Sequence, residues 1–232
     1  MAMEERGERA PLRIWGRLSS INVRKVVWCA QELGLAFQRT DAGGPFGVVQ
    51  TAGYRALNPN ALVPTIEVDD ADANADAGTA GGRFRLWESN VIVRYLCARH
   101  APGDLYPDAL PARFDAERWM DWQQTTLNPA GRDAFIQWVR TPAEGRDAAA
   151  AERSARAAEP RFAMLEAHLA TRSFMAGDRF TMADIPIGCE VHRWFGLPAS
   201  LYARPAWPNL ERYLAALRER PAARGVLDLA LE

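Results

Sequence analysis

Apolar and polar positions along the first forty residues predict a strand, a helix and a second strand. Residues 12–15 alternate as in a short strand, and residues 21–33 carry apolar side chains at helical spacing. Gly34 follows where such a helix would end, and residues 35–40 resume a strand pattern. Because a strand, a helix and a strand in this order form a β-α-β unit, we expect the two strands to be parallel.

Two more strands and a helix are predicted in the first hundred residues. Asn58-Pro59-Asn60 signals a turn, and residues 63–68 form a strand that opens with a proline, where a missing N–H is tolerated. Residues 69–82 contain only Asp, Ala, Gly, Asn and Thr, so we expect a tolerant surface loop outside the chemistry. Residues 84–87 form the fourth strand, and Ser89 is expected to cap the helix that follows.

Helical patterns dominate the second half of the chain. Pro111 fits the first turn of a helix that we expect to stop at Asn128-Pro129. Residues 148–169 form an Ala-rich helix in which Pro160 must kink the helix or begin a new segment. The spacing in Thr181-Met182-Ala183-Asp184 is that of a capping box, with Asp where Glu or Gln is usual.

An α+β half followed by an all-α half predicts two domains. We expect the first domain at residues 12–100 and the second at residues 112–232, joined by a linker at residues 101–111. Residues 1–11 lack the apolar stretch of a signal peptide and are expected to be a disordered tail.

Composition then narrows the class of partner and the compartment. The 28 basic and 29 acidic side chains give a net charge of -1, which argues against nucleic acid or an anionic membrane as the main partner. The three cysteines, Cys29, Cys97 and Cys189, are odd in number and form no C-x-x-C pair. We therefore expect no disulfide framework and no metal site, in a reduced, cytoplasmic protein.

The common catalytic motifs are not evident. His100, His168 and His192 are far apart and near no familiar Ser, Cys or carboxylate pattern. The stretch Gly43-Gly44-Pro45-Phe46-Gly47 lacks the spacing of a phosphate loop. The chemistry must therefore use simpler groups, or a reactive atom supplied by a bound cofactor.

Four motifs stand in a characteristic order and spacing along the chain: Ser20-Ile21-Asn22-Val23-Arg24-Lys25; Asn58-Pro59-Asn60-Ala61-Leu62-Val63-Pro64; Trp87-Glu88-Ser89-Asn90 with Tyr95-Leu96; and Gly177-Asp178 with Thr181-Met182-Ala183-Asp184. Together they resemble the cytosolic glutathione transferases, and specifically the bacterial members with serine-bearing N-terminal motifs. The resemblance runs from about Leu12 to Leu227 and implies a thioredoxin-like first domain that binds glutathione, with a helical second domain that lines the electrophile pocket.

The resemblance makes Ser20 the candidate donor to the glutathione thiolate. Lowering the pKa of a thiol from about 8.5 to about 6.5 takes roughly 2.7 kcal/mol, which one or two charge-assisted hydrogen bonds can supply. Asn22 is a second candidate donor, and Ser19 competes if the alignment shifts by one residue. From the residues alone, Ser20 and Asn22 are expected only to cap the helix. The resemblance favours the role of thiolate donor for Ser20 and leaves both roles open for Asn22.

The remaining candidates concern glutathione binding. Glu88 and Ser89 resemble the family's acidic residue and serine that hold the γ-glutamyl end of glutathione. The carboxylate of Glu88 suits the ammonium group of the ligand, and Ser89 with the helix N-terminus suits its carboxylate. The resemblance implies that the backbone of Val63 pairs with the cysteinyl part and that Pro64 is a cis-proline. Leu62 stands where the family often has a polar or basic contact to the glycyl end.

Two features leave alternatives open. Lys25 is the only lysine among the 28 basic residues. Either the site needs a compact ammonium there, or the lysine stands there by chance or forms a surface ion pair. The aromatics of the second half either line the electrophile pocket or form core: Trp119, Trp122, Phe135 and Trp138.

The sequence thus predicts a glutathione transferase that uses glutathione as co-substrate and no metal, attacks a small electrophile and forms a homodimer. A glutathione-dependent disulfide reductase or peroxidase is the alternative enzyme. A glutathione-binding or interaction module without catalysis is the alternative outside enzymes. Nothing in the sequence identifies the electrophile.

Overall fold

The computed structural model of the chain describes residues 12–69 and 83–232. The chain divides into two compact units, residues 1–92 and 93–232. The predicted disordered tail (1–11) and all but the first residue of the predicted tolerant loop lie outside the described residues, so both stay predictions.

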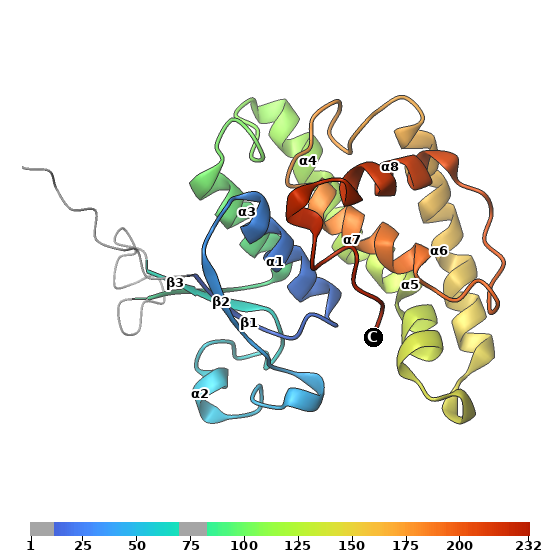
Figure 1. The fold of residues 1–232 in the computed structure, drawn as a ribbon, viewed down its shortest axis with the longest axis horizontal. Coiled ribbons are helices and arrows are strands. Elements are labelled where there is room, and N and C mark those ends of the chain that lie inside the picture. Colours follow the sequence, from blue (N-terminus) through green and yellow to red (C-terminus); the bar gives the residue numbers. More distant parts are fainter. Residues whose placement is uncertain (1–11, 70–82) are drawn as a thin grey trace, which may run out of the picture. The chain divides into compact units, whose positions relative to one another are not determined.

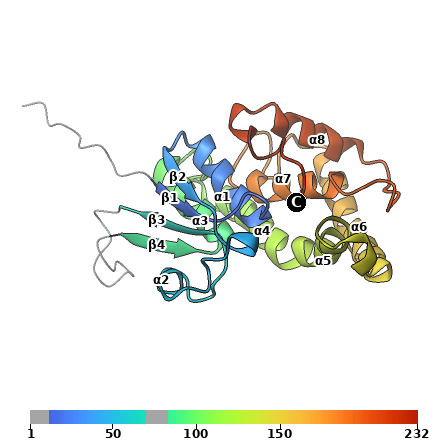
Figure 2. The same cartoon turned by 60° about the horizontal axis from the view of Figure 1, so that its bottom comes forward.

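The first unit is built on a four-stranded sheet in the order β2-β1-β3-β4 (Figures 1 and 2). Strand β1 (Leu12–Trp15) pairs in parallel with β2 (Phe37–Thr40), which confirms the predicted β-α-β unit. Strand β3 (Thr65–Val68) runs antiparallel to β1, and β4 (Phe84–Trp87) runs antiparallel to β3. Their apolar centre includes Ile14 of β1 and Ile66 of β3, which are both fully buried.

Among the described residues, three helices, one of them short, and one 3-10 turn lie between and after these strands. Helix α1 (Ile21–Glu32) connects β1 to β2, and its buried residues include Val23, Val26 and Trp28. The connection from β2 to β3 contains a 3-10 turn, Gly44–Phe46, and the short helix α2, Ala52–Arg55. Helix α3, Ser89–His100, begins in the first unit and continues into the second.

The start of α3 differs by one residue from the predicted start. The carbonyl oxygen of Glu88 accepts the N–H of Ile92 at 2.9 Å, so Glu88, and not Ser89, stands at the N-cap position. Glu88 has a φ of 70°, which is a left-handed conformation that a residue with a side chain adopts at a cost of about 1–3 kcal/mol. Sequence patterns do not show such a backbone conformation.

The second unit is helical. No helix among residues 12–69 and 83–232 is both long and apolar enough to cross a bilayer. Besides the rest of α3, the helices of this unit are α4 (Leu110–Trp122), α5 (Asn128–Phe135), α6 (Ala148–Leu169), α7 (Asp184–Phe195) and α8 (Pro208–Arg218).

One proline prediction for this unit is wrong, and another loses one of its two alternatives. The helix does not stop at Asn128-Pro129, because a π-helical turn, Gln123–Leu127, carries α4 directly into α5. Pro129 then lies in the first turn of α5, where its missing N–H costs little. Pro160 begins no new segment and lies inside the single helix α6.

Close packing of α5 against α6 explains why α6 stays whole. A Cβ built on Gly131 of α5 would lie 3.6 Å from the Cβ of Ala158, so the two helices approach closely at small residues. The hydroxyl of Ser154 donates to the carbonyl oxygen of Ala130 at 2.6 Å. Tertiary contacts of this kind can outweigh the local penalty of one proline.

The start of α7 is organised by the buried carboxylate of Asp184. Its Oδ2 accepts the N–H of Thr181 at 2.8 Å, which is the reciprocal half of the predicted capping box. Its Oδ1 accepts the N–H of Met175 at 2.8 Å and the hydroxyl of Tyr213 at 2.9 Å. Burial nevertheless dominates, and it raises the pKa of Asp184 to about 6.

We predict that this carboxyl makes stability fall as pH rises from about 4 to about 7. The folded protein keeps the proton in a range where the unfolded chain has lost it, so raising the pH through the folded pKa costs up to about 3 kcal/mol. Asp184→Asn removes this slope, but an amide has only one acceptor oxygen, so one of the two N–H groups, of Met175 or Thr181, loses its acceptor at a cost of about 1–3 kcal/mol.

Urea unfolding at about pH 4.5 and about pH 7 measures both effects. The advantage of the wild type over Asp184→Asn should shrink toward neutral pH, and an advantage that grows would contradict the argument. Asp178→Asn, at an exposed position, is the control and should change little at either pH.

Candidate functional site

One edge of the sheet gathers the site residues predicted in the first unit. The carboxyl ends of β1, β2 and β4 and the amino end of β3 lie in register there, since Trp15 pairs with Thr40 and with Thr65, and Thr65 pairs with Trp87. Three chain segments continue from this edge: the turn from β1 into α1, the segment that leads into β3, and the connection from β4 to α3.

Gly16 brings the first two segments into contact. A Cβ at this position would lie 2.4 Å from Cγ2 of Val23 and 3.2 Å from Cβ of Val63, and the φ of Gly16 is 146°. Only glycine fits this space. The turn that leads to Ser20 therefore lies directly against Val63.

Ser20 occupies the N-cap position of α1, but its hydroxyl does not cap the helix. Its backbone is extended and its carbonyl oxygen accepts the N–H groups of Val23 and Arg24 at 3.0 Å, while its side chain makes no capping hydrogen bond. The capping interpretation is thus wrong for this hydroxyl. A half-exposed donor at the N-terminus of a helix is well placed to meet an anion.

Asn22, Lys25 and Ser89 form a second polar group that links α1 to the start of α3. The hydroxyl of Ser89 donates to Oδ1 of Asn22 at 3.2 Å, and Nζ of Lys25 donates to Oγ of Ser89 at 3.5 Å. Ser89 is buried and Lys25 is fully buried, so Lys25 is not part of a surface ion pair. The structure therefore places Asn22 beside the predicted γ-glutamyl contact.

The segment before β3 contains a cis peptide bond between Val63 and Pro64, as the resemblance implies. The carbonyl oxygen of Leu62 accepts the hydroxyl of Tyr54 at 2.7 Å and Nδ2 of Asn58 at 3.0 Å. The Leu62 side chain itself is 64% exposed. Hydrogen bonds from Tyr54 and Asn58 thus fix the backbone of Leu62, while its side chain faces solvent.

Thr65 joins the same buried cluster, at 3.0 Å from the Tyr54 hydroxyl and 3.1 Å from Nδ2 of Asn58. Burial raises the pKa of Tyr54 and keeps its hydroxyl a donor. Sequence reasoning missed this supporting cluster. The Asn58-Pro59-Asn60 stretch indicated a turn and part of a family motif, but not a hydrogen-bonding role for Asn58. Tyr54 gave no signal, because its partners lie 8 and 11 positions away.

The connection after β4 presents Glu88 and Ser89 together. Glu88 is exposed, and Ser89 begins α3, where the first N–H groups of the helix have no intrahelical acceptor. A carboxylate at this N-terminus and an ammonium at Glu88 would both be satisfied. The one-residue correction at the N-cap leaves this chemistry intact.

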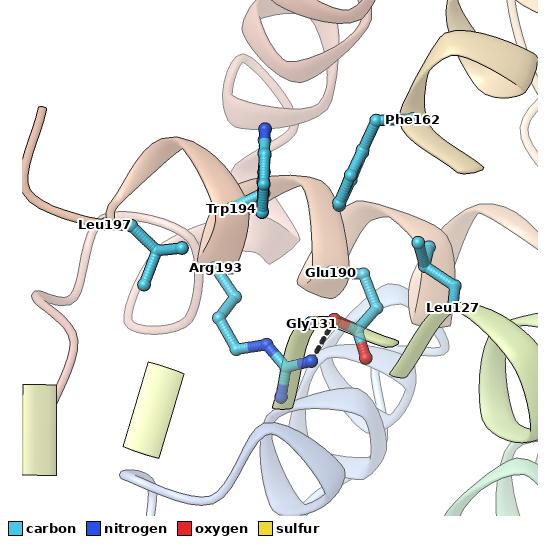
Figure 3. Close-up of a pocket in the computed structure, with 7 residues that line it drawn as sticks. All are labelled: Leu127, Gly131, Phe162, Glu190, Arg193, Trp194 and Leu197. Carbon is cyan, nitrogen blue, oxygen red and sulfur yellow. Dashed lines mark ion pairs between the residues drawn. The ribbon is translucent and has the colours of Figure 1, made fainter. Parts of the chain in front are cut away.

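The helical unit contains a pocket of its own (Figure 3). Its empty volume is about 210 Å³, including its open mouth. A buried ion pair crosses it: Nη2 of Arg193 lies 2.6 Å from Oε2 of Glu190, whose Oε1 accepts Nε2 of Gln123 at 2.8 Å. The lining residues are Leu127, Gly131, Phe162, Glu190, Arg193, Trp194 and Leu197.

None of the four aromatics considered from the sequence lines this pocket. Trp119, Phe135 and Trp138 are buried, and Trp119 packs edge-on against Trp122 at 5.4 Å between ring centroids. These contacts favour the core interpretation over a substrate-lining one.

The three cysteines are buried, and two of the histidines, His168 and His192, contact backbone carbonyl oxygens. Nε2 of His168 contacts the carbonyl oxygen of Met175 at 2.9 Å, and Nε2 of His192 contacts that of Leu229 at 3.0 Å. Within residues 12–69 and 83–232, no three His, Cys, Asp or Glu side chains gather as metal ligands would.

A four-stranded sheet with a cis-proline before β3, followed by a helical unit, defines a thioredoxin-like domain joined to an all-α domain. Two family models match the chain. The glutathione S-transferase N-terminal domain matches residues 19–99, and the glutathione S-transferase C-terminal domain matches residues 127–221. The chain therefore belongs to the glutathione S-transferase family.

Individual relatives agree with the family assignment. The chain is 39% identical over 216 residues to glutathione S-transferase GstB of Escherichia coli K12. The matched region covers 93% of this chain and 97% of the relative. A theta-class glutathione S-transferase from Xanthomonas axonopodis pv. citri, solved with glutathione bound, is 42% identical with a TM-score of 0.86, and covers 96% of this chain and 100% of that one.

A more distant structure shares the fold over a similar length. A glutathione transferase from Burkholderia graminis, solved with two glutathione molecules per subunit, is 26% identical with a TM-score of 0.79. The match covers 94% of this chain and 88% of that one. The predicted α+β thioredoxin-like domain followed by an all-α domain is thus confirmed.

Proposed function

We propose that this glutathione S-transferase binds reduced glutathione at the sheet edge of its first domain and activates the thiol through Ser20. The observation that carries the proposal is the Ser20 hydroxyl, which is not used to cap α1 and lies in a turn packed against Val63. The relatives solved with glutathione bound support the choice of ligand. The protein is then one of the serine-motif bacterial members.

The Ser20 hydroxyl stabilises the negative charge of the glutathione thiolate by donating a hydrogen bond to the sulfur. Its hydrogen bond to a thiolate is worth about 1.5–3 kcal/mol, and its hydrogen bond to a neutral thiol is worth less. The N-terminus of α1 adds a favourable dipole. The thiol proton leaves to solvent, and the thiolate attacks a small electrophile, forming a carbon–sulfur bond as the leaving group departs with its electron pair. No metal takes part in this scheme.

The ends of the tripeptide are held by groups that do not distinguish thiol from thiolate. Glu88 pairs with the ammonium, and Ser89 with the N-terminus of α3 receives the γ-glutamyl carboxylate. The backbone of Val63 pairs with the cysteinyl part, next to Pro64 and Leu62. Asn22 stands between the two roles, because it could donate to sulfur but also orients Ser89.

We assign glutathione binding to residues 12–100 and electrophile binding to residues 112–232, with residues 101–111 as the linker. A role in detoxification and a cytoplasmic location are part of the same proposal, since a buried set of reduced thiols suits that compartment.

Binding and activation should separate by mutation. We expect Ser20→Ala to raise the pKa of bound glutathione by about one to two units and to lower turnover, because the lost hydrogen bond matters chiefly for the anion. Glu88→Gln and Ser89→Ala should instead weaken glutathione binding and leave the thiol pKa in place. Titration of thiolate absorbance, beside steady-state kinetics with a chloroaromatic electrophile, measures both.

Asn22→Ala should give a smaller pKa rise together with weaker binding, since its partner Ser89 is released as well. An unchanged thiol pKa in Ser20→Ala, with a raised one in Asn22→Ala or Ser19→Ala, would assign activation to a different residue. Retention on immobilised glutathione without turnover would instead favour a binding module, and turnover of disulfides alone would favour a reductase.

The protein's own thiols should be dispensable. Cys29 lies in the interior of α1, away from the helix N-terminus that would stabilise a thiolate, and Cys97 and Cys189 are buried too. A triple Cys→Ala variant should keep most of its turnover, and its circular dichroism reports whether it has folded. A folded variant without turnover would overturn the proposal that glutathione supplies the reacting sulfur.

We also propose a homodimer, as the family resemblance implies. Light scattering at micromolar concentration should report about twice the 25.7 kDa mass of one chain. A particle of the mass of one chain across that concentration range would exclude the dimer.

A further inference from the structure

The proposed contacts satisfy only part of glutathione. The tripeptide carries two carboxylates and one ammonium group, and the start of α3 with Glu88 accounts for one carboxylate and the ammonium. The glycyl carboxylate is left over, and Leu62, at the position that the family often fills with a polar or basic contact, offers only an exposed apolar side chain. A cation from elsewhere in the fold would give this carboxylate the strong, charge-assisted contact that Leu62 does not make.

The geometry of the sheet edge shows where that end must lie. The γ-glutamyl contact follows β4, and the order of strands is β2-β1-β3-β4. Three strand spacings of about 4.8 Å separate β4 from β2. An extended tripeptide spans about 10 Å or more. A ligand anchored at Ser89 and paired with Val63 before β3 therefore ends above the β1 and β2 side of the edge.

Arg17 supplies a cation on that side. It stands two residues after the end of β1, and its carbonyl oxygen accepts the N–H of Ser20 at 3.1 Å, so it shares the turn that presents the proposed thiolate donor. Its guanidinium lies over two glycines that follow β2. A Cβ on Gly43 would lie 2.8 Å from Nη1, and a Cβ on Gly44 would lie 2.9 Å from Nε and Cζ of Arg17.

Gly43 also connects this guanidinium to the ligand-binding backbone. The same built Cβ on Gly43 would lie 3.5 Å from both Cγ atoms of Val63. The Arg17 guanidinium and Val63 thus flank one glycine. The glycine-rich stretch that had no role in the sequence analysis has one here, because any larger residue would displace the arginine.

Within residues 12–69 and 83–232, the Arg17 guanidinium has no hydrogen-bond acceptor and no carboxylate within ion-pair distance. The neighbouring arginines of this edge are engaged: Arg39 donates to the carbonyl oxygen of Gly16 at 2.8 Å and pairs with Asp41, and Arg55 donates to Gln50. Five N–H donors held in a fixed fork, without a protein acceptor, suit a carboxylate.

We infer that Arg17 binds the glycyl carboxylate of glutathione across Gly43 and Gly44, an inference that rests on the proposed glutathione site. Arg17 thus replaces the contact that Leu62 does not make. It follows that the enzyme should discriminate between glutathione and its glycine ethyl ester, in which that carboxylate is neutral and the thiol and γ-glutamyl end are unchanged.

Calorimetric titration of both ligands into wild type, Arg17→Gln and Arg17→Lys tests this. The wild type should bind the ester about tenfold or more weakly than glutathione, as expected for a lost charge-assisted hydrogen bond. Arg17→Gln should bind glutathione about tenfold more weakly than wild type does, and should bind both ligands within about twofold of each other. Arg17→Lys keeps the charge without the fork and should fall between the two.

Arg13→Gln, an exposed arginine on β1, is the control for a general loss of positive charge and should leave the preference unchanged. Wild-type discrimination that persists in Arg17→Gln would overturn the inference, while the glutathione site itself would stand. Undiminished glutathione affinity in Arg17→Gln, with loss of rate only for a carboxylate-bearing electrophile, would also overturn it and move Arg17 to the second substrate. A wild type that binds neither ligand would remove the proposed function.

Discussion

The candidate site depends on a point where the fold has no room for a side chain. Gly16 lets the turn after β1 pack against Val63, so the segment that carries Ser20 and the segment that carries the cis-proline meet at a backbone contact. Backbone contacts of this kind tolerate little relaxation, because protein interiors are close-packed and even one added methyl group disturbs the packing. The relative position of Ser20 and the backbone of Val63 follows from this contact.

Two groups of polar side chains fix the backbone and hydroxyl groups of the candidate site by hydrogen bonds. On one side Tyr54, Asn58 and Thr65 fix the carbonyl of Leu62, and on the other Lys25 and Asn22 hold the hydroxyl of Ser89. Both groups are buried or half-buried, where an unmade hydrogen bond costs more than a made one gains. These hydrogen bonds fix the orientation of the Leu62 backbone and of the Ser89 side chain. The exposed side chains of Leu62 and Glu88 do not take part in them.

Sequence patterns gave the strands of the first domain to within about two residues, because each strand has its own alternation and a nearby turn signal. They failed where tertiary packing decides. Pro129 looked like the end of a helix, but a π-helical turn places it in the first turn of the next one. The N-cap of α3 was displaced by one residue because the left-handed backbone of Glu88 has no sequence signal.

The site divides in the same way. Motifs locate the candidate residues Ser20, Glu88 and Ser89 and the cis-proline, because these lie in short contiguous segments. Tyr54 and Arg17 act through side chains that reach across to other segments, and a single sequence does not show which segments lie nearby. The glycine pair at residues 43–44 was visible as composition, and only the structure shows that it makes room for a guanidinium.

Burial of the single lysine also determines how this protein reacts with amine-directed reagents. Its other 27 basic side chains are arginines, and Lys25 is fully buried, so the folded chain exposes no lysine amine. Acylating agents and amine-directed cross-linkers have no lysine to modify while the first domain stays closed. When α1 separates from the start of α3, the amine becomes reactive, and its rate of modification reports how often that opening occurs.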